Sequence, residues 1–163
     1  MIGLTGVIDS TKMMLLSRLF SQQEDMKKFK LIINPLSGNG NGKRLLPEIL
    51  EHLNSRRIIY DWEVTSQAGH AAEIAYNAAL EDYEIIIAAG GDGTANEVIN
   101  GIMLSGKPFD SRPALAILSI GRGNDFAFGM GMATNWIQGM DVLSNPGERT
   151  IDLAYVEGGD YPG

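Results

Sequence analysis

The chain has 163 residues, of which 44% are hydrophobic and 20% charged, and this fits one soluble globular domain with a buried core. A formal net charge of −7 argues against a nucleic-acid-binding domain and against general attraction to anionic lipid surfaces, because both need basic surface. The sequence contains no cysteine, which excludes disulfides, thiol catalysis and cysteine-ligated metals, and is consistent with a cytosolic protein.

The N-terminus carries a short apolar stretch, "KMMLLSRLF", followed by "SQQEDMKK" rather than by a small-residue cleavage site. The stretch is also too short to span a bilayer. We therefore expect residues 1–28 to be a loose N-terminal extension, and residues 29–163 to form an α/β nucleotide-binding domain.

Beyond the extension, short apolar runs alternate with segments of helical periodicity. The expected strands are 29–35, 58–65, 83–89, 113–120 and 149–158, and the expected helices are 45–53, 69–81, 94–104 and 135–145. The first helix is expected to begin near Leu45, because Pro47 is tolerated only in a first turn. The continuous apolar run at 83–89 is typical of a strand buried on both faces.

This alternation predicts an α/β fold: a three-layer domain with a mostly parallel central sheet and right-handed crossovers. The last expected strand runs into a turn, "VEGGDYPG", with no partner strand after it. We therefore expect the chain to be the first part of a longer protein.

Three glycine-rich loops follow expected strands, at the edge where open α/β sheets bind ligands. In the first, "NPLSGNGNGKR" at 34–44, three glycines with Ser37 and Lys43 could surround a phosphate with backbone N–H groups. The spacing matches neither a P-loop nor a dinucleotide fingerprint. A mobile surface loop is the equally weighted alternative.

The second loop, "AAGGDGTANEVINGI" at 88–102, places Asp92 among three glycines. Thr94 and Glu97 match a capping box, so Thr94 has a structural reason to be there. The glycines permit close approach of a ligand to a helix N-terminus, which favours phosphate. An aspartate there would repel phosphate unless Mg²⁺ lay between them, so the pattern indicates metal–nucleotide binding.

The third loop, "SIGRGNDFAFGMG" at 119–131, contains a further acid, Asp125. Asp125 either caps the short helix that follows or faces the same cleft as Asp92. Asp152 lies between two apolar residues of the last expected strand, and faces either the cleft or solvent.

These blocks, "IINPLSGNGNGK", "VTSQAGHAAEIA", "IIIAAGGDGTANEVINGI" and "SIGRGNDFAFGMGM", resemble successive motifs of the diacylglycerol kinase catalytic-domain family, especially its bacterial lipid kinase branch. The resemblance extends over residues 30–158. It implies the nucleotide-binding domain of a protein whose C-terminal β-sandwich domain is absent from this chain. The implied fold is related to the nucleotide-binding domain of NAD kinases and phosphofructokinases.

The implied activity is transfer of the γ-phosphoryl group of ATP to a hydroxyl of a lipid such as diacylglycerol, with Mg²⁺. The cofactor-binding residues that the resemblance implies are Asn34, Ser37, Gly38, Thr65, Gly90, Gly91, Asp92, Gly93, Thr94, Ala95, Asn96, Arg122 and Asn124. Asp92, Asp125 and Asp152 would surround Mg²⁺ through waters. The protein is expected to be cytoplasmic and at most peripheral to the membrane, with a lipid substrate and no nucleic-acid partner. The oligomeric state, a homodimer among the options, is left open.

Two departures from the family pattern bear on these expectations. Arg122 stands where the family usually has a threonine near the nucleotide, so it either pairs with a phosphate or fills nucleotide space. The family's catalytic base lies in the C-terminal domain, so no residue here takes that role and this chain alone is expected to be inactive. A NAD-kinase-like enzyme and a non-catalytic nucleotide-binding module are the alternatives, although the block "GNDFA" favours the lipid kinases.

Overall fold

A computed structural model of the chain describes residues 28–144 and 147–156. Four parallel strands form one sheet in the order β2-β1-β3-β4. The strands are β1 (Lys28–Ile33), β2 (Ile59–Val64), β3 (Ile85–Gly90) and β4 (Ala114–Ser119). Because the strands are parallel, all four carboxyl ends lie at the same edge of the sheet, as the three glycine loops require.

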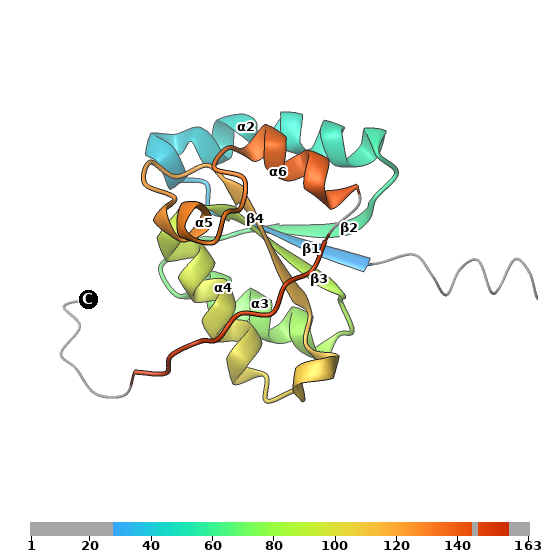
Figure 1. Cartoon of the computed structure of the whole chain (residues 1–163). Helices are drawn as coiled ribbons and strands as arrows, with labels where there is room; N and C mark the ends of the chain where they lie inside the picture. Colours follow the sequence, from blue (N-terminus) through green and yellow to red (C-terminus); the bar gives the residue numbers. More distant parts are fainter. Residues whose placement is uncertain (1–27, 145–146, 157–163) are drawn as a thin grey trace, which may run out of the picture.

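Helices cover both faces of the sheet, with α2 and α6 on one side and α3 and α4 on the other (Figure 1). The helices are α2 (Ser37–Ser55), α3 (His70–Leu80), α4 (Asp92–Leu104), α5 (Asp125–Gly129) and α6 (Trp136–Leu143), with a 3₁₀ turn, η1, at Phe109–Ser111. This arrangement confirms the predicted three-layer α/β fold with a parallel sheet.

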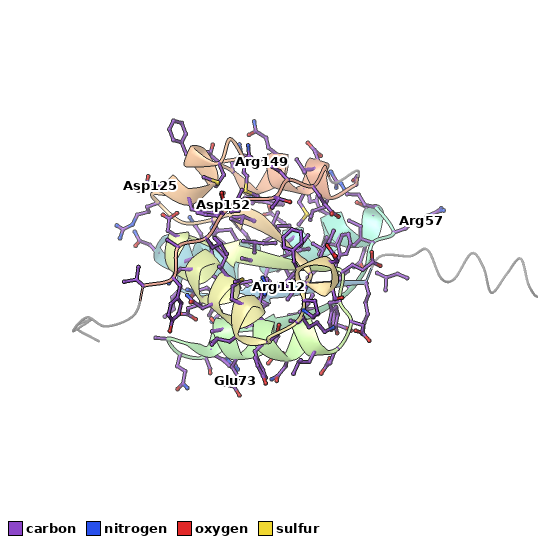
Figure 2. All side chains as sticks on the ribbon, turned by 60° about the horizontal axis from the view of Figure 1, so that its bottom comes forward. Arg57, Glu73, Arg112, Asp125, Arg149 and Asp152 are labelled. Atoms are coloured by element: carbon purple, nitrogen blue, oxygen red, sulfur yellow. The ribbon has the colours of Figure 1, made fainter. Side chains whose placement is uncertain are left out.

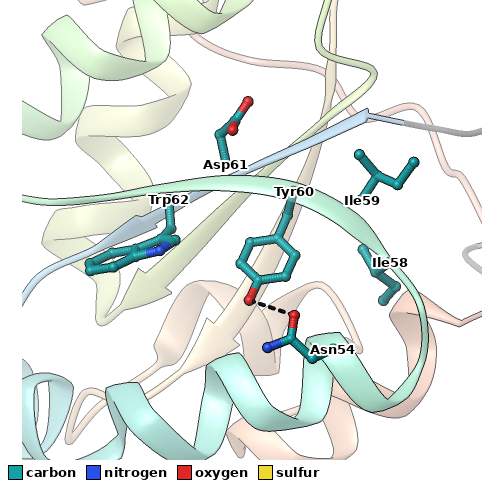
Figure 3. Close-up of a pocket in the computed structure, with 6 residues that line it drawn as sticks. All are labelled: Asn54, Ile58, Ile59, Tyr60, Asp61 and Trp62. Atoms are coloured by element: carbon teal, nitrogen blue, oxygen red, sulfur yellow. Dashed lines mark hydrogen bonds between the residues drawn. The ribbon is translucent and has the colours of Figure 1, made fainter.

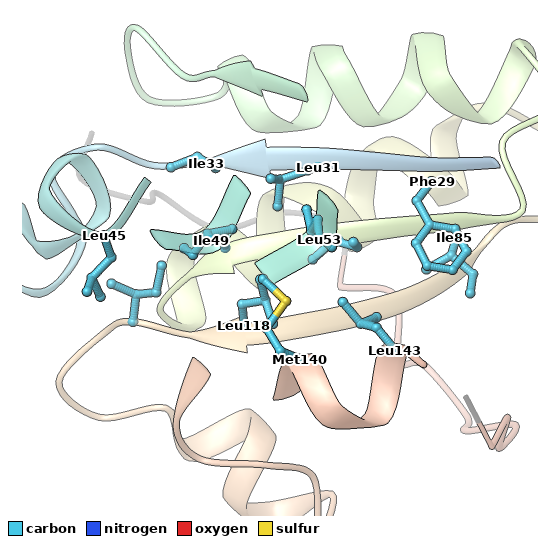
Figure 4. Packing of buried hydrophobic residues seen from close by; sticks show 13 residues of the cluster. Phe29, Leu31, Ile33, Leu45, Ile49, Leu53, Ile85, Leu118, Met140 and Leu143 are labelled. Atoms are coloured by element: carbon cyan, nitrogen blue, oxygen red, sulfur yellow. The ribbon is translucent and has the colours of Figure 1, made fainter. Parts of the chain in front are cut away.

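The core divides into two clusters because successive side chains of a strand point to opposite faces. Leu31 and Ile33 of β1 face α2 and α6, where they meet Ile49, Leu53 and Met140 (Figure 4). All five side chains are fully buried. The β3 strand is buried along its whole length, as its apolar sequence predicts.

On the opposite face, β1 and β3 pack against α3 and α4. The α3 contribution is mostly alanine, with Ala71, Ala75, Ala78 and Ala79 buried. Small side chains let the helix axis lie close to its neighbours. At Gly101 of α4 an added Cβ would lie 2.2 Å from the Ala72 carbonyl oxygen, so the two helices are in backbone contact.

The predicted start of the first helix near Leu45 is wrong. Helix α2 begins at Ser37 and includes a left-handed turn at Gly38, Asn39 and Gly40, after which regular helix continues through Pro47. Pro47 is therefore in the helix interior, where it removes one backbone hydrogen bond. The glycine loop thus forms a left-handed turn, with non-helical φ/ψ at Gly38, Asn39 and Gly40, and the right-handed helix that contains Pro47 follows it.

The predicted last strand is also not formed in the described residues, because 147–156 have no regular secondary structure. The segment is exposed, and the Arg149 guanidinium donates a hydrogen bond to the Met130 carbonyl. The expected N-terminal extension lies outside the described residues except for Lys28, which begins β1. In the part of the chain that the structure describes, no helix is both long and apolar enough to cross a membrane.

Candidate phosphate-binding site

The loops that follow the strands meet at the carboxyl edge of the sheet. The Asn34 amide donates to the Ala89 carbonyl (3.1 Å), the Thr65 amide to Ile33 (2.8 Å) and the Ile120 amide to Gly90 (2.9 Å). Each bond continues the strand pairing by one residue, so the loops begin side by side. The structure thus brings together the starts of all the segments that carry predicted site residues, except that of Asp152.

Asn34 links the loop after β1 to α4. Its Nδ2 donates to Thr94 Oγ1 at 3.1 Å, and its Oδ1 accepts from the Leu36 amide at 3.0 Å. Thr94 is only 4% exposed, so the hydroxyl is held inside the structure. Two of the predicted cofactor-binding residues therefore fix each other's side chains, with Thr94 buried and Asn34 half-buried.

The capping box predicted at Thr94 and Glu97 is wrong. Helix α4 begins two residues earlier, at Asp92, with Gly91 as N-cap, so Thr94 lies within the helix. Glu97 turns away from its own helix end, and its Oε2 accepts the Ala71 amide of α3 at 3.1 Å. Tertiary contacts, rather than local capping, account for both side chains.

Close packing of the loops explains several of the glycines. A Cβ at Gly90 would lie 2.3 Å from Thr94 Oγ1, and one at Gly121 would lie 2.5 Å from the Gly91 Cα. The loops after β3 and β4 therefore touch, backbone against backbone. Gly93 differs: it is exposed, and a Cβ there would meet nothing within 4 Å. Packing between the loops thus explains Gly90 and Gly121, whereas Gly93 is left for a bound ligand to explain.

The first glycine loop joins the same packing. Gly38 adopts a positive φ of 61°, and a Cβ there would lie 2.3 Å from the Ile120 carbonyl oxygen. The 34–44 loop is therefore packed against the loop after β4, which argues against the alternative of a mobile surface loop. Ser37 begins α2 and is half-buried.

Asp92 and Asp125 both lie close to Gly123. A Cβ at Gly123 would be 3.2 Å from Asp92 Oδ2 and 3.5 Å from Asp125 Oδ2. Asp92 Oδ1 accepts the Phe126 amide at 2.9 Å, and this bond lowers the pKa of Asp92 although partial burial opposes it. Asp92 is therefore ionised and ties α4 to α5 while its second oxygen remains near the glycine.

Asn124 lies close to these loops, and its side-chain oxygen lacks a hydrogen-bond donor among the described residues. It is 8% exposed and left-handed (φ 57°), and its Nδ2 donates to the Gly121 carbonyl at 3.0 Å. Its Oδ1 is buried and has no hydrogen-bond partner among the described residues. A buried acceptor without a donor is costly, so this oxygen fits a site that is completed by a bound donor.

Asp152 is not gathered with the other two acids. It is exposed and lines a groove along β4, and neither Asp92 nor Asp125 lines that groove. Within residues 28–144 and 147–156, no group of three or more histidine, cysteine, aspartate or glutamate side chains is arranged to hold a metal directly. The water-mediated network of three acids stays a prediction, with two of its members adjacent.

The other predicted residues have mixed surroundings. Arg122 is exposed in the loop before α5, and Asn96 is exposed on α4, where its carbonyl and side chain accept from Asn100. Ala95 is buried, so its side chain packs in the interior of the protein. A separate hollow along β2 contains none of the predicted residues; there the Tyr60 hydroxyl donates to Asn54 Oδ1 at 3.1 Å (Figure 3).

Comparison with known proteins identifies the family of this chain. The family model for the diacylglycerol kinase catalytic domain matches residues 28–156. The chain belongs to the diacylglycerol kinase catalytic-domain family. It is 38% identical over 134 residues to a diacylglycerol kinase of Bacillus subtilis (strain 168), and 35% identical over 127 residues to one of Staphylococcus carnosus (strain TM300).

These alignments cover 82% and 78% of this chain but only 43% and 40% of the relatives, so the chain spans about two fifths of their length. A crystal structure of a diacylglycerol kinase from Bacillus anthracis str. Sterne matches with a TM-score of 0.60 and 28% identity. That match covers 73% of this chain and 39% of the solved chain. Family and fold therefore agree with the resemblance found in the sequence.

Proposed function

We propose that this chain forms the ATP-binding part of a lipid kinase that transfers the γ-phosphoryl group of ATP to a lipid hydroxyl, such as that of diacylglycerol. Membership of the diacylglycerol kinase family supports a kinase that acts on a lipid. The observation that carries the ATP assignment is the start of α4, where Gly93 borders open space and where Asp92 lies, like Asp125, close to Gly123 of the neighbouring loop.

The residues at this edge fit a phosphate chain with a divalent cation. The first amides of α4 lack helical partners, and the positive end of the helix dipole favours phosphate. Ionised Asp92 and nearby Asp125 would repel phosphate alone, whereas Mg²⁺ between them would neutralise the charge. Asp92 Oδ2 and the unpaired Asn124 Oδ1 are oxygens of the kind that accept from metal-bound water.

In this proposal the chain's own residues bind and orient the phosphate donor. Asn34 and Thr94 keep the loops in register, and the Phe126 amide fixes the Asp92 carboxylate. Mg²⁺, when bound, supplies charge neutralisation, which together with positioning is most of what phosphoryl transfer requires. We place the catalytic base and the lipid site in the part of the relatives that this chain does not cover, and the full-length protein in the cytoplasm, at the membrane surface when it acts.

A thin-layer assay on the full-length protein tests the proposal, with radiolabelled ATP, Mg²⁺ and one of three acceptors: diacylglycerol, sphingosine or NAD. We expect label on diacylglycerol and loss of labelling when EDTA is added. Labelled NAD would overturn the lipid assignment.

A non-catalytic module is the second candidate, because Arg122 is exposed where the family usually has a threonine. Calorimetry on the full-length protein distinguishes it from a kinase. Tight binding of ATP and Mg²⁺ without turnover on any acceptor would favour the module. The Arg122→Thr variant would then show whether the guanidinium is the reason for lost turnover.

A further inference from the structure

Helix α3 begins without a cap of its own. Its N-cap residue is Gly69, left-handed at φ 82°, which has no side chain to accept from the first amides of the helix. The Ala71 amide instead donates to Glu97 Oε2 of α4 at 3.1 Å. The start of α3 is therefore capped by a carboxylate from another helix, and this bond joins residues 26 apart in sequence.

The packing of α3 on α4 aims Glu97 at this amide. Gly101 follows Glu97 by one helical turn, on the same face of α4, and approaches the Ala72 carbonyl too closely to admit a Cβ. The helices are thus locked together by backbone contact just beyond the Glu97 bond. Little freedom remains for the carboxylate to move away while the helices stay packed.

The segment just before α3 is the loop after β2, residues 65–69, which starts with the predicted nucleotide-binding residue Thr65. At its start the Thr65 amide is bonded to β1. Within the loop the Ser66 amide donates to His70 Nδ1 at 3.1 Å, and the His70 amide donates to the Gln67 carbonyl. His70 closes the loop from within, and Glu97 fixes the helix that follows it.

We propose that Glu97 is a positioning residue, which holds the Thr65 loop in place relative to the start of α4 and so couples the two parts of the phosphate-donor site. The proposal rests on the proposed function. Glu97 itself need not touch the nucleotide. It acts through the Ala71 amide, because α4 carries both Glu97 and, one turn earlier, Gly93 and Thr94.

The test is steady-state kinetics with varied ATP on the full-length protein and four variants. Glu97→Ala removes the acceptor, Glu97→Asp keeps the charge but shortens the reach, and Glu97→Gln keeps an oxygen that accepts the same bond. Glu73→Ala is the control, since Glu73 is an exposed acid in the first turn of α3, the helix whose start Glu97 caps (Figure 2).

We expect Glu97→Ala and Glu97→Asp to raise KM for ATP about tenfold with kcat changed less than about threefold, as loss of a hydrogen bond to a charged group predicts. Glu97→Gln keeps a neutral hydrogen bond and should raise KM for ATP by about threefold or less. Glu73→Ala should stay within about twofold of wild type. If Glu97→Ala does not fold, the contrast between the Asp and Gln variants decides.

A lowered Tm with unchanged KM in the Ala and Asp variants would show a purely structural contact and overturn the proposal. Equal loss in the Gln variant would also overturn it, because the hydrogen bond would then not be the cause. Wild-type protein that neither binds nor uses ATP would refute the proposed function instead, and that result is visible before any variant is compared.

Discussion

Two glycines of the Gly-Gly-Asp-Gly loop should respond in opposite ways to the same substitution. Gly90→Ala places a Cβ 2.3 Å from Thr94 Oγ1 and 2.5 Å from Thr94 Cβ, and Thr94 is buried and bonded to Asn34. Gly93→Ala places a Cβ in open space, within the first turn of α4 and without a positive φ. Packing therefore opposes the first change and helix propensity favours the second.

The magnitudes follow from these surroundings. Overpacking a rigid site costs about 1–3 kcal/mol, which outweighs the ~0.4–1 kcal/mol that Gly→Ala gains through the unfolded chain. We expect Gly90→Ala to lower the free energy of unfolding by about 1–2 kcal/mol, or roughly 2–8 °C in Tm. Gly93→Ala should raise stability by up to ~1 kcal/mol, the helix propensity difference.

Thermal unfolding of the full-length variants measures both effects, and ATP binding by calorimetry adds the functional contrast. Gly93→Ala should fold well but bind ATP at least about tenfold more weakly, because a methyl group would stand where the phosphate chain approaches. Gly129→Ala is the matched control, being an exposed helical glycine whose Cβ would also meet nothing.

A Gly90→Ala variant as stable as wild type would contradict the clash with Thr94, and a stable Gly93→Ala variant that binds ATP normally would contradict the phosphate site at the start of α4. A second variant examines the cause: adding Thr94→Gly to Gly90→Ala removes every side-chain atom of the clash. The double variant should then be less destabilised than the sum of the two single changes.

Three further predictions concern other parts of the chain. Asp92→Asn should retain the fold and lose Mg²⁺-dependent kinase activity in the full-length protein, at least about a hundredfold in kcat; an unchanged rate would refute its role. Pro47→Ala should raise stability by about 1–3 kcal/mol in chemical denaturation, because it restores a hydrogen bond inside α2; no change would mean that the helix is already distorted there. The pKa of Asp61 is lowered chiefly by a hydrogen bond from the Tyr83 hydroxyl, and that of Asp92 by the Phe126 amide. Their folded-state pKa values lie below the unfolded value of about 3.9, so their stabilisation is present above about pH 4 and is lost as pH falls below it. Unfolding monitored from pH 6 to pH 2 should therefore show a steeper loss of stability for wild type than for Tyr83→Phe.

Several elements followed from local pattern alone. The run of isoleucine and alanine in β3 predicts a strand buried on both faces, and the alanines of α3 predict a helix that packs closely on a sheet. Both signals are strong because burial on these faces requires apolar side chains at fixed spacing. The motif order also predicted the family that the comparisons show.

The errors lie where local rules competed with tertiary contacts. Pro47 predicted a later start for α2, but the element begins at Ser37 with a left-handed turn, in which Gly38 packs against the Ile120 carbonyl. Thr94 and Glu97 fit a capping pattern, yet each is bonded to a distant segment instead. No periodicity within the sequence reports such partners.

By itself, the sequence determined the alternating elements, the parallel sheet and the edge at which the glycine loops collect, because apolar spacing and chain order are local properties. Only the tertiary structure decided that Gly90 and Gly121 are needed for close packing and that Gly93 borders open space. It also showed that Asp92 and Asp125 adjoin while Asp152 lines a separate groove. These distinctions depend on distances of a few ångströms between segments far apart in the chain, and such distances are fixed only when the layers pack together.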